Sequence, residues 1–203
     1  MLLDWLAPVY DRYCSAIGLG SHFREVTLQH AGLEPGDRVL DVGCGTGVLT
    51  RVARRAVGPQ GVVVGIDPGP VMIARARENA RAGADPVEFR LAAIEKLPFP
   101  DASFDVVLSS LMFHHLPPAT KGEGLREVLR VLVPGGKLVL VDVDRPANLL
   151  WWLVAWPFLF LPMTAGNLRG EVPAFVESAG FAQGRATGRW WGLLSFWRAV
   201  KPT

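Results

Sequence analysis

The 203-residue chain is poor in cysteine, in net charge and in clustered basic residues. Its two cysteines, Cys14 and Cys44, do not have the spacing of metal ligands. The formal net charge is +2, and no block of Lys or Arg marks a nucleic-acid-binding surface. Residues 1–5 lack the basic stretch that precedes the apolar region of a signal peptide. These absences predict a cytoplasmic protein with free thiols, no metal ion and no nucleic-acid partner.

The chain also lacks an apolar run long enough to cross a membrane in a relaxed helix. Hydrophobic residues make up 50% of the sequence, and much of the excess lies in residues 146–168, which contain no charged side chain. Pro157 and Pro162 interrupt this segment, and a membrane-spanning helix needs about 20 uninterrupted apolar residues. The length suits one domain with a substantial core, so we expect residues 1–203 to form a single domain.

Strand-like and helix-like runs alternate from residue 37 to about residue 144, which is typical of βαβ units and a parallel sheet. Continuous apolar runs, such as residues 62–64 and 138–141, indicate strands that are covered on both faces. Strands are expected at 38–41, 61–66, 87–91, 104–108, 137–143 and 190–200. Helices are expected at 48–57, 71–82 and 170–179, and residues 125–132 are expected to be the end of a further helix. A turn is expected at 134–136. Residues 1–36 are expected to form helices that precede the sheet.

The most informative segment is residues 39–47, with the sequence VLDVGCGTG. A buried strand ends there in an acid and three alternating glycines, which allow a sharp turn and close approach of a ligand to the backbone. A dinucleotide-binding turn would have its third glycine at the position of Val48, so the spacing differs from that motif. Asp67 ends the next strand, where an acid either accepts bonds from both hydroxyls of a ribose or caps the helix that starts near Pro70.

Three motifs together resemble class I S-adenosylmethionine (SAM) methyltransferases. They are the DVGCGTG sequence from residue 41, LPFPDASFD at 97–105 and RVLVPGG at 130–136. The resemblance covers about residues 35–145. The segments 7–12 and 177–181 are similar to the branch that includes the C-methyltransferases of ubiquinone and menaquinone synthesis.

The resemblance implies a Rossmann-like α/β fold with a seven-stranded, mostly parallel sheet, helices on both faces and an antiparallel final hairpin. It implies SAM as cofactor and S-adenosylhomocysteine as product. Residues 37–145 would bind SAM beneath the helices of 1–36, residues 146–169 would form an apolar lid, and residues 170–203 would add a helix and strands. The residues assigned to the cofactor are Gly43, Gly45 and Gly47 at the methionyl part, Asp41 at the ammonium, Asp67 at the ribose, Pro68 and Met72 near the adenine, and Tyr10, Ala93, Ile94 and Ser109.

One position departs from the family pattern. Where the family has Gly-Asp-Ala before the LPF motif, this chain has Ala92-Ala93-Ile94, so Ala93 replaces the acid that meets the adenine amino group. The backbone contact at Ile94 would remain. Glu95 either takes over the side-chain contact or points into solvent.

Three residues are candidates for catalysis. Tyr10 would close over SAM, or it anchors the first helices to the core. His114 and His115 follow the fourth strand, where ligands of open α/β sheets bind, and an imidazole there could take a proton from the acceptor or orient it. Their alternative role is to cap or pack a loop. Methyl transfer needs mainly alignment and exclusion of water, so no catalytic dyad has to be visible in the sequence.

The charge-free segment leaves two interpretations. It is a buried helix that covers the sheet, or it is a lid for an apolar acceptor that also touches a membrane surface through its tryptophans, with Arg145 and Arg169 near lipid phosphates. The favoured function is methyl transfer from SAM to a hydrophobic acceptor, either a phospholipid amine head group or a quinone precursor. The location would be cytoplasmic, peripheral to the inner membrane face. The alternatives are a methyltransferase for a small soluble compound and a non-catalytic SAM-binding module at the membrane.

Overall fold

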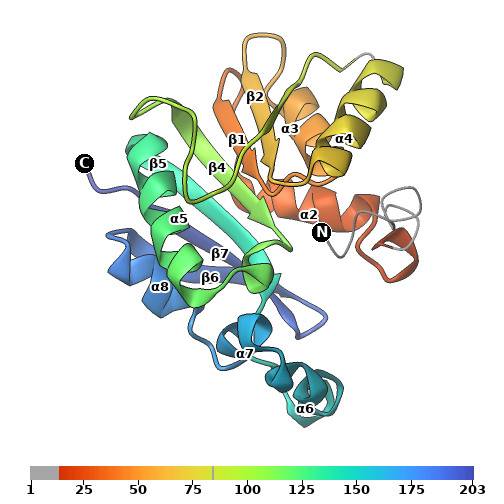
Figure 1. Cartoon of the computed structure of the whole chain (residues 1–203), viewed down its shortest axis with the longest axis vertical. Helices are drawn as coiled ribbons and strands as arrows, with labels where there is room; N and C mark the ends of the chain where they lie inside the picture. The colour runs from red at the N-terminus through yellow and green to blue at the C-terminus, as the bar shows by residue number, and fades with distance from the viewer. Residues whose placement is uncertain (1–13, 84) are drawn as a thin grey trace. The chain divides into compact units, whose positions relative to one another are not determined.

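The computed structural model describes residues 14–83 and 85–203 (Figure 1). The chain divides into two compact units, Met1–Ala93 and Ile94–Thr203. The organisation of residues 1–203 as one domain stays a prediction.

The first unit contains three parallel strands and the helices that connect them (Figure 1). The strands lie in the order β3-β2-β1. Their bounds are β1 Arg38–Val42, β2 Val62–Asp67 and β3 Glu88–Leu91, and the helices are α2 Ser21–Ala31, α3 Val48–Ala56 and α4 Pro70–Ala82. The apolar run in β2 is buried from Val63 to Ile66, as its sequence predicts. Gly32 ends α2 in the left-handed conformation, and Ser21 is the first residue of the helix.

Phe89 of β3 fills the space beneath the glycine turn of this unit. A Cβ atom on Gly47 would lie 2.6 Å from Phe89 Cζ, and one on Gly65 would lie 2.7 Å from Phe89 Cδ1. Cys44 and Ala76 belong to the same buried cluster. Both glycines are therefore needed for close packing of β2, β3 and the turn.

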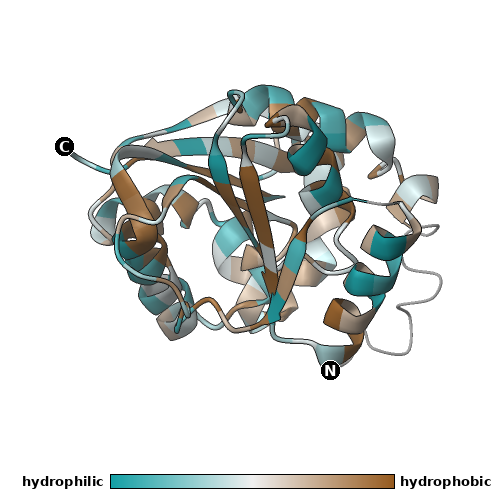
Figure 2. Ribbon diagram, turned by 90° about the horizontal axis from the view of Figure 1, so that it is seen from above, coloured by the Kyte–Doolittle hydropathy of each residue, from teal (hydrophilic) through white to brown (hydrophobic). Residues whose placement is uncertain are grey.

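The second unit contains the remaining four strands in the order β4-β5-β7-β6. β4 and β5 are parallel, and β7 pairs antiparallel with both β5 and β6. The strands are β4 Phe104–Ser110, β5 Leu132–Val143, β6 Ala182–Trp190 and β7 Leu194–Val200. The helical elements are η2 Phe113–His115, α5 Pro118–Val131, α6 Leu149–Ala155, η3 Trp156–Phe160, α7 Pro162–Leu168 and α8 Val172–Ser178. Buried apolar residues at 106–108 of β4 and 138–141 of β5 form much of the core of this unit, and Figure 2 shows a central strand coloured brown along most of its length. The strands and helices confirm the Rossmann-like, mostly parallel α/β fold.

Two boundaries in the second unit differ from the sequence prediction. The expected final strand, 190–200, is the end of β6, a turn at Gly192 and then β7 from Leu194. β6 was missed because most of its side chains are exposed and it lacks the apolar alternation of a half-buried strand. The expected turn at 134–136 lies inside β5, where the pairing with β4 shifts register and Gly135 has a φ of 77°.

Candidate cofactor and acceptor sites

The glycine turn after β1 is held in a conformation that only glycine adopts easily. Gly43, Gly45 and Gly47 have φ angles of 73°, 53° and 77°. The N–H groups of Gly43 and Cys44 both donate to the carbonyl of Ile66, at 2.8 and 2.9 Å. Among the described residues, no atom would lie within 4 Å of a Cβ on Gly45, whereas Gly47 is packed against the core. Gly45 is therefore where the turn leaves open space for a ligand beside the backbone.

Asp67 joins the end of β2 to this turn. Its Oδ2 accepts from the N–H of Gly45 at 3.1 Å, and its Oδ1 accepts from the N–H of Gly69 at 2.7 Å. The N-cap residue of α4 is Gly69, and it makes no side-chain capping bond. Asp67 is therefore not the N-cap of α4, and its contact with the start of this helix is the bond that it accepts from the N–H of Gly69.

Asp41 lies behind the turn and is almost fully buried, with 1% of its surface exposed. The hydroxyl of Thr50 donates to its Oδ2 at 2.6 Å. Burial, together with the negative charge of Asp67, raises the pKa of Asp41 to about 6, although the Thr50 bond opposes the shift. A cation near Asp41 would favour the ionised carboxylate.

These residues of the first unit fit the chemistry of SAM. The open space at Gly45 accepts a ligand next to backbone, Asp67 can accept hydroxyl groups, and Asp41 supplies negative charge for an ammonium group. Met72 is buried, with 7% exposed, whereas Pro68 is exposed. The individual contacts to SAM stay predictions, and Tyr10 lies outside the described residues.

At residues 93–95, where the chain departs from the family pattern, the three side chains differ in how far they are buried. Ala93 is partly buried and Glu95 is exposed, which agrees with the solvent-facing alternative for Glu95. Ile94 is buried, and a Cβ on Gly124 of α5 would lie 2.8 Å from its side chain. The Ile94 side chain therefore packs on α5, and only its backbone is a candidate for the adenine ring.

In the second unit, His114 of η2 is paired with Asp142 of β5. The Nδ1 atom of His114 lies 2.6 Å from Asp142 Oδ1. Asp142 is 1% exposed, and its other oxygen accepts from the N–H groups of Phe113 and His114 at 2.7 and 3.3 Å. Because a carboxylate only accepts, we assign the proton of the neutral imidazole to Nδ1, which leaves Nε2 as the basic nitrogen.

The two histidines have opposite electrostatic environments. Burial lowers the pKa of His114, but the charge and hydrogen bond of Asp142 outweigh this effect and the repulsion from Lys121, so the pKa is raised above 6.5. Burial and the neighbouring His114 lower the pKa of His115. The ring centroids of the two histidines lie 3.9 Å apart. His114 is therefore the one of the pair that is both oriented and basic.

Two buried hydroxyl groups share a sheet face with Asp142. β4 pairs Ser109 with Leu140, two residues before Asp142, and β7 pairs Ser195 with Asp142, so the period of two puts all three side chains on one face. Neither Ser109 nor Ser195 has a hydrogen-bond partner for its hydroxyl among the residues that the structure describes. An unpartnered buried hydroxyl costs about 1–3 kcal/mol, which a polar group brought by water or ligand would offset.

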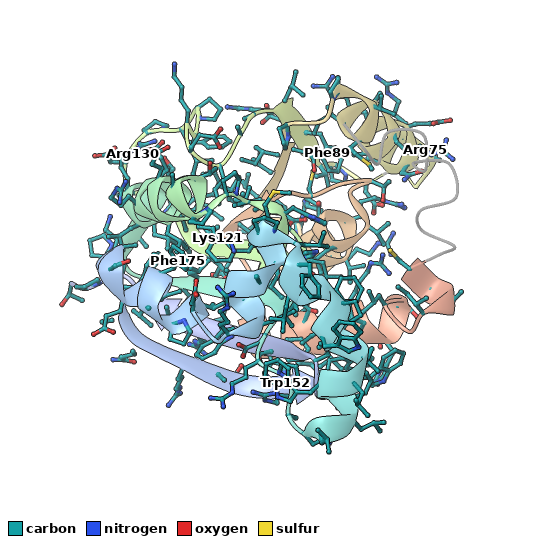
Figure 3. The ribbon with its side chains drawn as sticks, turned by 60° about the horizontal axis from the view of Figure 1, so that its bottom comes forward. Arg75, Phe89, Lys121, Arg130, Trp152 and Phe175 are labelled. Atoms are coloured by element: carbon teal, nitrogen blue, oxygen red, sulfur yellow. The ribbon has the colours of Figure 1, made fainter. Side chains whose placement is uncertain are left out.

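Sequence reasoning missed Asp142, Ser195 and Lys121. Asp142 left a signal, because it is an acid within the buried run of β5. Lys121 left none: it resembles a solvated helix residue, yet it is 1% exposed. Its ammonium donates to Asn167 Oδ1 at 2.6 Å and to the Met163 carbonyl at 3.0 Å, both on α7. Figure 3 shows it beside Phe175, whose ring centroid is 5.7 Å away.

The charge-free segment is mostly exposed, so its interpretation as a buried covering helix is wrong for α6 and η3. α7 turns inward, with Thr164, Ala165, Asn167 and Leu168 buried, whereas α6 buries only Ala155. Large apolar side chains of α6 and η3 face outward, the most exposed being Leu149 at 75% and Phe160 at 77%. We call the exposed face of α6 and η3 the apolar face; it comprises Leu149, Leu150, Leu153, Val154, Trp156, Phe158 and Phe160. Across the described part of the chain, no helix has the length and apolar character to cross a membrane.

Comparison with known proteins agrees with the motifs. The profile of a methyltransferase domain family matches residues 39–136. The ubiquinone/menaquinone biosynthesis C-methyltransferases UbiE of Ectopseudomonas mendocina and Pseudomonas putida are 38% and 37% identical over 169 residues. Each alignment covers 80% of this chain and 65% of the relative, so the chain spans about 65% of the length of these curated relatives.

Solved structures show the same likeness. A SAM-dependent methyltransferase from Aquifex aeolicus is 25% identical, with a TM-score of 0.68 over 88% of this chain and 89% of that one. A putative methyltransferase of Haloferax volcanii, solved with the Trm112 activator, shares the fold at 20% identity, with a TM-score of 0.73 over 99% and 98% of the two chains. Motifs, fold and relatives together show that the chain belongs to the class I SAM-dependent methyltransferases, a family of enzymes whose cofactor is SAM.

Proposed function

We propose that this chain transfers a methyl group from SAM to a ring carbon of a hydrophobic quinone precursor. The observation that carries the cofactor half of the proposal is the open space at Gly45, whose N–H is bound by Asp67. The likeness to relatives named as ubiquinone/menaquinone C-methyltransferases supports the acceptor class, and the exposed apolar face supports a hydrophobic acceptor.

SAM, when bound, supplies an electrophilic methyl group on a positively charged sulfur. In the proposal, Gly45 offers backbone to the methionyl part, Asp67 accepts bonds from the ribose hydroxyls, and ionised Asp41 attracts the ammonium. Pro68, Met72, Ala93 and the Ile94 backbone form the adenine side, with Ser109 and Tyr10 as further cofactor contacts. None of these side chains performs covalent chemistry, because alignment and electrostatics suffice for this reaction.

Carbon methylation of a ring would form a bond between the ring carbon and the methyl group as the methyl–sulfur bond breaks, with S-adenosylhomocysteine as the leaving group. The ring carbon would then lose its proton. We propose that Nε2 of His114 accepts this proton and later releases it to water. Asp142 is a positioning residue, since its bond to Nδ1 fixes the tautomer that exposes a basic Nε2. His115 is the second candidate for the same role.

A transfer assay tests the reaction. SAM labelled in its methyl group is incubated with the protein and a lipid extract from cells whose own quinone C-methyltransferase is disabled. We expect label in the quinone fraction. Label in phospholipid would replace the ring acceptor by an amine head group, and label only in a water-soluble fraction would support the soluble-compound alternative. Retained SAM binding without transfer to any fraction would support a non-catalytic module.

The pH dependence of turnover tests the histidine. Because Asp142 raises the pKa of His114, the rate should increase with pH through a midpoint above 6.5. Asp142→Asn removes the raising charge, so the midpoint should move down and the maximal rate should fall. His114→Gln should remove the transition while leaving SAM affinity unchanged. An unchanged profile in both variants would contradict the assignment.

We also propose that the segment 146–169 acts as a lid over the acceptor and touches the inner membrane face reversibly. The exposed aromatic side chains of Trp156, Phe158 and Phe160 support this, because such residues are favoured at a membrane interface. Trp156→Ala with Phe160→Ala should reduce sedimentation with lipid vesicles and transfer to the lipid acceptor. Equal sedimentation of this variant and the wild type would contradict membrane contact through the segment.

A further inference from the structure

A pocket of about 620 Å³ lies in the second unit beside the start of α6. Its walls include Arg145 and Asn148, which precede α6, Leu149 and Trp152 of α6, and Arg189 of β6. Figure 3 shows Trp152 at the end of the β6–β7 hairpin, where α6 approaches it.

The pocket has walls that are fixed by specific contacts. The N–H of Ala147 donates to the carbonyl of Gly192 in the β6–β7 turn at 2.9 Å. A Cβ on Gly192 would lie 2.6 Å from Trp151 Cδ1, so this tryptophan packs closely on the turn. Arg189 donates from Nη1 to the Arg145 carbonyl at 2.9 Å. The chain before α6 is therefore bonded both to β6 and to the β6–β7 turn.

The charged side chains in its walls are both cationic. Arg189 Nη2 lies 3.9 Å from a carboxylate oxygen of Asp144, which is 3% exposed and turned inward. Arg145 is exposed, and within residues 14–83 and 85–203 no carboxylate pairs with its guanidinium. Arg145 therefore gives the pocket a positive charge that no described carboxylate pairs with, and its guanidinium suits the oxygens of a phosphate.

The surface next to the pocket is apolar. Leu149, in the wall itself, is 75% exposed, and the apolar face continues from it along α6 and η3. A ligand that satisfies both surfaces carries an anionic group beside hydrocarbon. A bilayer containing anionic phospholipid presents this combination, with phosphates in one plane just above the acyl chains.

We infer that this pocket binds the phosphate head group of an anionic phospholipid in a bilayer while the apolar face rests in the interface. The inference rests on the membrane contact proposed above and names its lipid chemistry. It involves none of the residues assigned to SAM or to proton transfer.

Vesicle sedimentation tests the inference with phosphatidylcholine alone and with an equal mixture of phosphatidylcholine and phosphatidylglycerol. The wild type should bind the mixture more tightly, and added salt should weaken that binding. Arg145→Gln should weaken binding to the mixture by roughly fivefold, from the ~1 kcal/mol that a basic residue contributes near an anionic surface. Arg185→Gln is the matched control, since Arg185 is an exposed arginine of β6 outside the pocket.

Arg145→Lys separates a pocket from diffuse attraction. It keeps the charge but loses the planar fork, so a phosphate-binding pocket predicts weaker binding, whereas full retention would overturn the inference. Equal losses in Arg145→Gln and Arg185→Gln would overturn it as well. Tight binding of inorganic phosphate without vesicles would also overturn the inference, and so would a dimer that buries the apolar face in place of lipid.

Absence of binding to either vesicle would refute the membrane contact itself. Binding that depends on Trp156 but is unchanged in the Arg145 variants would refute only the pocket. Unchanged thermal midpoints confirm that the variants are folded.

Discussion

Replacing the buried acid of the glycine turn should stabilise the protein while it weakens cofactor binding. Asp41 is 1% exposed, and its pKa is raised from 3.8 to about 6. Asp41→Asn keeps the size of the side chain and an oxygen that can accept the Thr50 hydroxyl, but it removes the charge. The variant therefore isolates the cost of keeping an ionised carboxylate in this position.

The size of the effect follows from the pKa. Between 3.8 and about 6 the folded protein keeps a proton that the unfolded chain has released, so the free energy of unfolding falls as pH rises through this window. A shift of about two units corresponds to about 3 kcal/mol, which is lost above pH 6 and present below pH 4. Asp41→Asn has no such titration. Its stability relative to the wild type should thus be about 3 kcal/mol more favourable at pH 8 than at pH 4.

Urea denaturation of both proteins at pH 4, 6 and 8 measures this difference, and calorimetric titration with SAM at pH 8 measures binding. The variant should bind SAM more weakly by roughly 1.5–3 kcal/mol, because it loses a charge-assisted contact to the ammonium. Wild-type affinity should fall as pH drops through about 6, where Asp41 takes up its proton. A stability difference that does not change with pH would refute the electrostatic reasoning, and undiminished affinity would refute the role of Asp41.

Four further substitutions probe packing and the cofactor site. Gly47→Ala should unfold the protein at lower urea than Gly45→Ala, since only the first places a methyl group 2.6 Å from a core ring, whereas Gly45→Ala should chiefly weaken SAM binding by calorimetry. Lys121→Met should lower the free energy of unfolding by about 1–3 kcal/mol, because Asn167 loses a buried donor; an unchanged urea midpoint would contradict this. Ala93→Asp should hold or tighten SAM binding by about 0.5–1.5 kcal/mol if it restores a hydrogen bond to the adenine, and weaker binding by the folded variant would contradict the alignment there.

The fold was largely predictable because its main signals are local. Buried parallel strands such as β2 and β5 are continuous apolar runs, and glycine and proline mark most of their ends. β6 was not located, because an exposed strand gains its order from pairing with β7, and its own sequence carries no apolar period. The 134–136 turn lies inside β5 because pairing with β4 at Leu132 resumes at Lys137 after a register shift, which the local turn signal does not reveal.

Site residues were predictable from the sequence where a ligand-binding residue also serves a sharp turn or a strand end. Gly45 and Asp67 stand out because a sharp turn and a strand-end acid have sequence signatures. The pairing of His114 with Asp142 joins residues far apart in the chain, and no spacing rule connects them. Lys121 shows the limit most clearly: an ammonium that looks solvated in the sequence is buried by the packing of α5 against α7.

Lys121 also fixes one end of the charge-free segment, whose apolar side chains are exposed to water. Exposing Leu149 and Phe160 forgoes roughly 1.5–3 kcal/mol for each side chain that could have been buried. Loose packing is not the reason, because Lys121 fixes α7 through Met163 and Asn167, and the hairpin turn fixes the start of α6. Both ends of the segment are thus attached to the second unit by polar bonds, while the side chains between them face outward. An apolar surface that is held outward at both ends is better explained by a ligand or lipid that covers it than by a core that failed to close.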